Sequence, residues 1–257
     1  MKKNDLGNFR IKLKAMKTTI LCLLTLAAAL STQGQQMTLA EARARIPKRE
    51  VPAFWLGEFK GLTERWTGLA AAKVKAIAVS PGGRPLHLIS YGELEPLRQE
   101  ANFNSAVGAR RSAAYRDKAA RLRPVILFVG PVHGHEVEAL TGLGNLVQIM
   151  ETGRDLRGRE QSQMLALGRR CRLLIIPTGN PDGLARFEPR MLHDMALSDV
   201  RFWGQGTWSD NSLCKWPDVK SVHPMAGSRV GFLGCYFNGA GVNPMHDEFF
   251  APMSSEA

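Results

Sequence analysis

Short apolar runs and one longer helical pattern organise the middle of the chain. The runs at 74–79, 85–91, 125–129 and 173–177 have the length and the apolar content of β-strands. The first two flank the turn sequence SPGGR and predict a β-hairpin. The last two are apolar throughout and predict buried strands. Apolar residues recur at helix-like intervals over 136–152, which predicts an amphipathic helix.

The flanking regions carry weaker signals. Residues 38–45 predict a short helix, and the basic, alanine-rich residues 110–122 predict an exposed helix before a central strand. Residues 186–257 show little periodicity and are rich in Gly, Pro, Trp and Asn, which predicts long loops over a scaffold. The pattern indicates one α/β domain (73–257), preceded by a small extension at 35–72.

Residues 1–34 have the composition of a targeting segment. Basic residues precede the apolar run at 20–30, and small or polar residues follow it. A run of this length is too short to span a bilayer, so the segment predicts a secretory signal peptide and a secreted or periplasmic protein. Met16 is a second candidate start, because the sequence from there has all three parts of a signal peptide. A membrane anchor is the alternative.

The net charge gives little support for a nucleic-acid partner. The chain has a net charge of +11, but residues 1–34 hold six of its 34 Lys and Arg and one of its 23 Asp and Glu, which leaves +6. The remaining excess is spread over 43–49, 110–123 and 157–170 without interleaved aromatic residues. A nucleic-acid-binding protein concentrates such charge on one face. We therefore expect solvated helix faces and no nucleic-acid partner.

Three cysteines follow the predicted signal peptide: Cys171, Cys214 and Cys235. In an oxidising compartment Cys214 and Cys235 could pair and leave Cys171 unpaired near a strand. Three free thiols are an equally good interpretation of an odd count. The spacing of these cysteines fits no zinc ribbon.

The strongest candidate chemistry lies where the strand at 125–129 meets the following helix. His133, His135, Glu136 and Glu138 fall within six residues on this turn. Ligands of open α/β sheets bind beyond the carboxyl ends of the strands. A catalytic zinc takes three protein ligands, often two His and a carboxylate. His133 and Glu136 are three residues apart, so one turn could aim both at one point. A solvated polar loop is the alternative.

Two further motifs follow in order. The strand at 173–177 ends in Asn180-Pro-Asp-Gly, which taken alone predicts a turn, because Pro fixes φ and Gly tolerates positive φ. The segment GVNPMHDEFF occupies 241–250. His133 and Glu136 form an HxxE pair. Together with this pair, these motifs over roughly residues 70–250 resemble the zinc carboxypeptidase family. The hairpin sequence SPGGRPLHLISYG is also similar to the segment before HxxE in that family.

The resemblance implies a fold and a division of labour among residues. The fold is a mixed, mostly parallel twisted sheet with helices on both faces, here incomplete at the C-terminal end. His133 and Glu136 would be zinc ligands, and His135 would lie behind the ligands or face the substrate. Arg186 or Arg190 would stabilise the developing oxyanion of a cleaved peptide. Asn243 and His246 would bind substrate.

Two departures from the family pattern affect function. If Met245, His246 and Asp247 align with the family's Asn-Arg-Asn-like segment, His246 replaces the arginine that grips a terminal carboxylate. A histidine lacks the planar bidentate fork of arginine, so an amidase-like or endo-acting specificity becomes possible.

The third zinc ligand and the general-base glutamate of the family lie beyond this segment, and His193 and His223 precede it. We therefore expect a truncated catalytic domain with very low activity of its own.

Three other interpretations stay open. A deacylase-type amidohydrolase acting on N-acyl amino acids shares the fold and the HxxE pair. A metal-dependent amidohydrolase barrel could use His133 and His135, but it needs many more βα units after them. A catalytically inactive pseudo-peptidase could bind peptides or cell-wall fragments. The cofactor that the carboxypeptidase resemblance implies is zinc.

Overall fold

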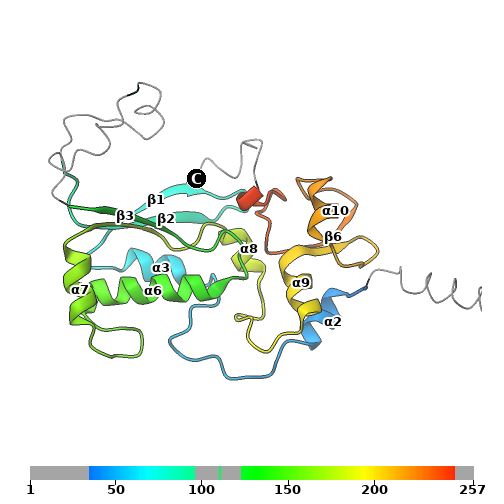
Figure 1. Cartoon of the computed structure of the whole chain (residues 1–257). Coiled ribbons are helices and arrows are strands. Elements are labelled where there is room, and N and C mark those ends of the chain that lie inside the picture. Colours follow the sequence, from blue (N-terminus) through cyan, green and yellow to red (C-terminus); the bar gives the residue numbers. More distant parts are fainter. Residues whose placement is uncertain (1–34, 96–109, 111–122, 247–257) are drawn as a thin grey trace, which may run out of the picture.

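A mixed four-stranded sheet forms the centre of the described chain. The computed structural model describes residues 35–95, 110 and 123–246. The order in the sheet is β1-β2-β4-β3, and a separate two-stranded sheet pairs β5 with β6 (Figure 1). The elements are α2 (Leu39–Ala44), α3 (Leu62–Thr67), β1 (Lys73–Val79), β2 (Pro85–Tyr91), β3 (Val125–Val129), α6 (Val137–Thr152), α7 (Ser162–Arg169), β4 (Arg172–Ile176), α8 (Pro181–Arg186), α9 (Leu197–Gln205), β5 (Gly206–Trp208), α10 (Trp216–Lys220), β6 (Val230–Leu233) and the 3-10 turn η2 (Pro244–His246).

The strand directions follow from the connections between the strands. A tight turn joins β1 to β2, which forces them to be antiparallel, and β2 also pairs antiparallel with β4. The connection through α6 and α7 lets β3 and β4 run parallel. The prediction of a mixed α/β sheet is therefore confirmed. Among the described strands, however, one pairing of three is parallel, so the expectation of a mostly parallel sheet does not hold for this part.

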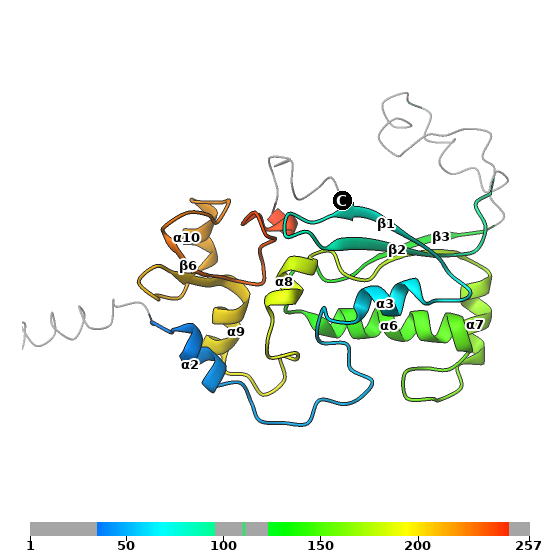
Figure 2. The ribbon, with the colours of Figure 1, turned by 180° about the vertical axis from the view of Figure 1, so that it is seen from behind.

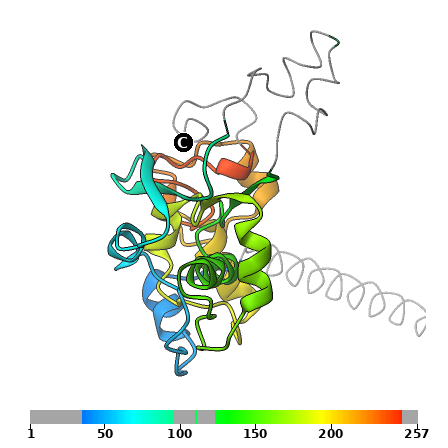
Figure 3. The same cartoon turned by 90° about the vertical axis from the view of Figure 1, so that its left-hand side faces the viewer.

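Helices α3, α6 and α7 lie along one face of the sheet (Figures 1 and 3). The helix-containing segments before β1 and between β3 and β4 both run over that face. The prediction of helices on both faces is thus not met by the described residues. β3 is the outer strand of the described sheet, and its side chains Val125, Leu127 and Val129 are 40%, 58% and 53% exposed. The prediction that this strand is buried is therefore wrong for the described part of the chain, where β3 lies at the edge of the sheet and pairs with β4 alone.

One large core holds the molecule together, and a small one lies beside it. Residues of the sheet, α6 and α9 pack with Met37, Ala42, Leu62 and Trp66 from the N-terminal region. Residues 35–72 therefore share the main core. The second core gathers Cys214, Val219, Met225 and Phe237. Figure 2 shows its elements, α10 and β6, beside α9 at the end of the molecule away from α7.

Most predicted elements are confirmed. The hairpin, the strand at 125–129, the helix after it and the strand before the Asn-Pro-Asp-Gly motif appear within a residue or two of their expected bounds, and α2 lies within 38–45. The region after 186 instead forms α9, β5, α10 and β6, so the prediction of long loops there was too simple. The predicted signal peptide and the predicted helix at 110–122, apart from residue 110, lie outside the described residues.

Two further observations bear on the sequence-based expectations. Cys171, Cys214 and Cys235 are free thiols, so the described residues match the interpretation without a Cys214–Cys235 disulfide. In the described part of the chain, every helix is too short or too polar to cross a bilayer.

Candidate metal centre

The HxxE pair lies on the turn that carries the chain from β3 into α6. The backbone N–H of Gly130 donates to Ile176, and that of Glu136 donates to His133, so the turn is compact. Glu136 is the N-cap residue of α6, yet its side chain does not cap the helix. The carboxylate instead points back along the turn toward His133. A carboxylate at this position also gains from the positive end of the α6 dipole.

His133 and Glu136 are in direct contact. The Nδ1 of His133 lies 3.0 Å from Oε1 of Glu136. The His133 side chain is 12% exposed and that of Glu136 is 46% exposed, so the pair is open to solvent on the carboxylate side. Burial acts to raise the pKa of Glu136, but the hydrogen bond and the charge of His133 outweigh it and hold the pKa below its usual value. The carboxylate is therefore ionised at neutral pH, as a metal ligand must be.

This pair fits part of a zinc site. Zinc–ligand distances of about 2.0–2.2 Å place two tetrahedral donors roughly 3.3–3.6 Å apart. The 3.0 Å between the His133 and Glu136 donor atoms is close to that separation. Among the described residues, no group of three His, Cys, Asp or Glu side chains could hold a metal. They thus supply two donors of the three that a catalytic site takes.

Aromatic rings surround the two histidines. The ring of Tyr236 stacks on His133 with centroids 4.1 Å apart and planes 16° from parallel. His135 is 3% exposed, with its ring 5.0 Å from Tyr236 and 6.1 Å from Phe187 between centroids. Burial lowers the pKa of His135 to about 4. His135 therefore faces the protein interior, which leaves His133 and Glu136 as the more accessible pair of the turn.

The Asn-Pro-Asp-Gly segment begins a helix. Asn180 is the N-cap of α8, its side chain accepts from the Gly183 N–H at 2.9 Å, and Pro181 takes the first helical position. The prediction of an isolated turn is therefore corrected. Asn as an N-cap followed by Pro at the first position is a recognised helix-start signal, so the sequence could have revealed it.

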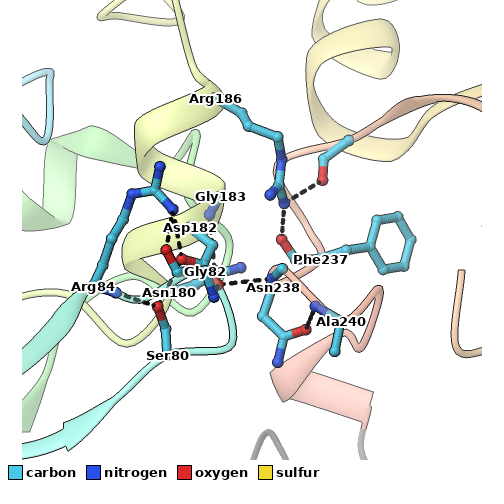
Figure 4. Close-up of polar contacts among 12 residues, drawn as sticks. Ser80, Gly82, Arg84, Asn180, Asp182, Gly183, Arg186, Phe237, Asn238 and Ala240 are labelled. Atoms are coloured by element: carbon cyan, nitrogen blue, oxygen red, sulfur yellow. Dashed lines mark hydrogen bonds and ion pairs between the residues drawn. The ribbon is translucent and has the colours of Figure 1, made fainter. Parts of the chain in front are cut away.

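Asp182 ties α8 to two distant loops (Figure 4). Its side chain is fully buried and accepts from Ser80 Oγ at 2.7 Å and from an Arg84 Nη at 2.9 Å. The backbone N–H groups of Gly82 and Gly239 donate to it at 3.0 and 2.7 Å. Burial acts to raise the pKa of Asp182, but these four donors hold it below its usual value. We name this group the Asp182 hub.

The HxxE turn packs directly on α8. A Cβ added to Gly134 would lie 2.0 Å from the backbone carbon of Gly183 and 2.0 Å from the backbone nitrogen of Leu184. Only a residue without a side chain fits there. The Gly134 N–H also donates to the Cys235 carbonyl at 2.8 Å. The Asp182 hub thus holds the helix against which the HxxE turn is placed.

The two candidate arginines have different surroundings. Arg186 donates to the backbone carbonyls of Gly234 and Phe237 (Figure 4), and burial lowers its pKa. Arg190 has a positive φ of 63°, and its guanidinium lies 3.2 Å from a Glu58 carboxylate oxygen, with the side chain 40% exposed. Arg186 is therefore committed to a loop, while Arg190 reaches the surface.

The candidate substrate-binding residues belong to the last described segment. Asn243 is fully buried; its N–H donates to Nε2 of His223 at 2.8 Å and its Oδ1 accepts from Met245 at 3.0 Å. Its Nδ2 is buried without a partner among the described residues. The backbone of His246 ends η2. Asn243 thus lies within the fold and helps to shape the segment that carries His246.

Comparison with known proteins identifies the family. The model of the zinc carboxypeptidase peptidase family matches residues 70–231. This chain belongs to the zinc carboxypeptidase family. The resemblance read from the motifs is therefore confirmed, and the amidohydrolase barrel is excluded.

Solved structures of carboxypeptidases are similar to parts of the chain. A metallo-carboxypeptidase from Burkholderia cenocepacia is 19% identical, with a TM-score of 0.33 over 49% of this chain and 27% of that one. A metallo-carboxypeptidase from Pseudomonas aeruginosa is 18% identical, with a TM-score of 0.29 over 63% and 34%. Carboxypeptidase A from Helicoverpa armigera is 13% identical, with a TM-score of 0.28 over 75% and 39%. The chain thus spans about a quarter to two-fifths of these structures. The search of curated proteins found no match.

Sequence reasoning placed the HxxE pair but missed its surroundings. Tyr236, Gly134 and Asp182 each contact or support the turn, and none was singled out as a site residue. Gly134 carried a usable signal, because a glycine between two histidines on a strand-to-helix turn indicates a close backbone approach. Tyr236 lies about 100 residues after His133 and carried no such signal.

Proposed function

We propose that the chain is part of a zinc-dependent carboxypeptidase-like hydrolase that cleaves peptide or amide bonds. The observation that carries the proposal is the 3.0 Å contact between His133 Nδ1 and Glu136 Oε1 on the turn between β3 and α6. His133 and Glu136 would hold the zinc, which when bound supplies a polarising charge for the scissile carbonyl and an activated water. The family match over residues 70–231 supports this choice of metal and reaction.

Of the two arginines, we propose Arg190 as the group that stabilises the developing oxyanion. Its guanidinium is partly exposed and paired with Glu58, whereas that of Arg186 donates to two backbone carbonyls. An exposed ion pair is weak and exchanges readily for a substrate, so Arg190 is free to reach a ligand. Arg186 keeps a structural role in fixing the loop at 234–237.

The substrate is a peptide or an N-acyl amino acid whose recognition differs from the family pattern. We propose that Asn243 shapes the subsite from within the fold and that His246 takes part in binding the substrate. A histidine binds a terminal carboxylate less tightly than a bidentate arginine does. Amidase-like or endo-acting cleavage therefore agrees with this segment, and a deacylase-type activity is the alternative within the same fold.

The expected location is secreted or periplasmic, with residues 1–34 as a cleaved signal peptide. The basic leader and short apolar run of this segment support that location. No nucleic-acid partner is expected, because the modest basic excess is spread along the chain.

Zinc binding to the 257-residue chain tests the proposal. We expect weak one-to-one binding in competition with a chromophoric chelator, because the described residues supply two donors. His133→Ala and Glu136→Gln should each abolish it. His193→Ala is the matched control, since His193 is 75% exposed and pairs with Asp194 at 3.3 Å.

Two results would overturn the proposal. Zinc binding that survives in both His133→Ala and Glu136→Gln would place the metal elsewhere. Failure of the wild-type chain to bind zinc at millimolar metal would favour a metal-free peptide-binding protein. Rapid peptide hydrolysis by this chain would contradict the expected low activity while leaving the metal assignment standing.

A further inference from the structure

The stack of Tyr236 on His133 restricts the imidazole that the proposed function uses. The two rings lie 4.1 Å apart between centroids and are 16° from parallel. On its edge, His133 Nδ1 contacts Glu136. A ring held by a flat partner on its face and a carboxylate on its edge has little freedom to rotate about χ2. The imidazole edge is therefore presented in one direction.

The backbone that carries Tyr236 is itself fixed. The Cys235 carbonyl accepts from the Gly134 N–H at 2.8 Å, inside the HxxE turn. The Asn180 Nδ2 donates to the carbonyls of Cys235 and Tyr236 at 3.4 and 3.3 Å.

A third anchor comes from the end of α8. Arg186 donates to the carbonyls of Gly234 and Phe237, on either side of Cys235 and Tyr236 (Figure 4). Residues 234–237 are thus held by the HxxE turn and by both ends of α8. The half-buried ring of Tyr236 is thus carried by backbone that is anchored on both sides, so its place against His133 is fixed.

We propose that Tyr236 is a positioning residue that clamps the His133 imidazole with Nδ1 directed at Glu136, the other residue that would hold the zinc. This inference rests on the proposed function, because it assigns His133 as a ligand. Partners that orient a ligating histidine typically change metal affinity by about 10- to 100-fold when they are lost. Most such partners bind the second ring nitrogen. His133 Nε2 is buried without a partner among the described residues, so the stack takes over the orienting role here.

Three variants of the 257-residue chain test the clamp. Tyr236→Phe keeps the ring, Tyr236→Leu removes it, and Phe232→Leu is the matched control. Phe232 stacks on Phe202 at 4.7 Å and 9°, so its loss removes a similar stack within the main core. Zinc affinity by chelator competition should fall at least about 10-fold in Tyr236→Leu. It should stay within about twofold of wild type in Tyr236→Phe and Phe232→Leu.

A measurement without metal separates this inference from the proposed function. In the metal-free chain, carbon relaxation of the His133 ring should report one rigid orientation in wild type and Tyr236→Phe, and fast ring motion in Tyr236→Leu. Absence of zinc binding by wild type would defeat the proposed function, whereas the relaxation data would still decide the clamp. Equal ring rigidity in Tyr236→Leu and wild type would overturn it. So would a Tyr236→Phe variant as impaired as Tyr236→Leu, because the hydroxyl would then be responsible.

Discussion

Two regions of this chain use charged side chains in opposite ways. In the Asp182 hub, one fully buried carboxylate accepts from four donors that belong to two separate loops, at 80–84 and at 239. In the N-terminal region, by contrast, Arg43 and Glu188 form a two-pronged ion pair whose side chains are 54% and 39% exposed. Both arrangements join segments far apart in sequence. They differ in how much water reaches the charges.

That difference determines which contacts position the site. Water screens the exposed pair and solvates its members when they separate, so its net contribution to stability is small. A buried carboxylate has no such alternative, and its loss leaves donors unsatisfied. Residues 35–72 are anchored by buried Met37, Ala42, Leu62 and Trp66 instead. The hub therefore fixes helix α8, on which the HxxE turn packs. The ion pair adds little stability to a contact that apolar burial already makes.

The largest expected effect is at the hub itself. Asp182→Asn should lower the free energy of unfolding by about 3–5 kcal/mol at neutral pH, because Arg84 loses its buried partner and the amide cannot accept all four hydrogen bonds. Urea unfolding followed by circular dichroism measures it. Asp210→Asn is the control, since Asp210 is exposed and accepts from Ser212 in its own turn. A midpoint for Asp182→Asn that equals the control's would contradict the prediction.

The next effect tests the close approach of the HxxE turn to α8. Gly134→Ala should lower the free energy of unfolding by about 3 kcal/mol, because the new Cβ would collide with backbone atoms of Gly183 and Leu184 that cannot turn aside. Gly142→Ala is the control. Nothing lies within 4 Å of a Cβ at that helical position, so alanine should stabilise the chain by up to about 1 kcal/mol. Equal unfolding midpoints for the two variants would refute the backbone contact.

A smaller effect appears in the pH dependence of stability. The pKa of Asp182 is lower in the folded chain than the unfolded value of about 3.9. A lowered folded pKa stabilises the chain above the unfolded pKa, and this stability is lost as pH falls through the folded pKa. The difference in stability between wild type and Asp182→Asn should therefore be constant from pH 7 to about pH 5 and shrink below about pH 4. A difference that persists unchanged to acid pH would show that the carboxylate charge is irrelevant.

The smallest effect is expected at the exposed pair. Arg43→Ala should leave the unfolding midpoint almost unchanged, because solvent already competes for both charges. The small remaining difference from wild type should vanish in 1 M NaCl, where screening is strong. Met37→Ala in the same region should destabilise the chain clearly, because Met37 is 1% exposed in the main core. If Arg43→Ala lowered the unfolding midpoint and the decrease persisted in 1 M NaCl, this ion pair would contribute to stability as the Asp182 hub does.

Sequence periodicity predicted the elements whose pattern is contained in one short stretch of chain. The strands at 125–129 and 172–176 and the helix α6 are local patterns, and they appear where expected. The HxxE pair was found for the same reason, since three residues on one turn are enough to bring His133 and Glu136 together. Failures came where burial depends on neighbours. The apolar strand β3 was expected to be buried, yet its exposure depends on which strands and helices pack around it.

The sequence by itself determined the order of strands and helices, the family and the two adjacent donors of the candidate zinc site, because each is encoded within a short stretch of chain. The tertiary structure decided what holds those donors in place. Asp182 binds Ser80, 102 residues away, and Gly239, 57 residues away, and Tyr236 reaches His133 from a distant loop. Contacts at such separations leave no periodic trace in the sequence, since they exist only when the whole chain has packed.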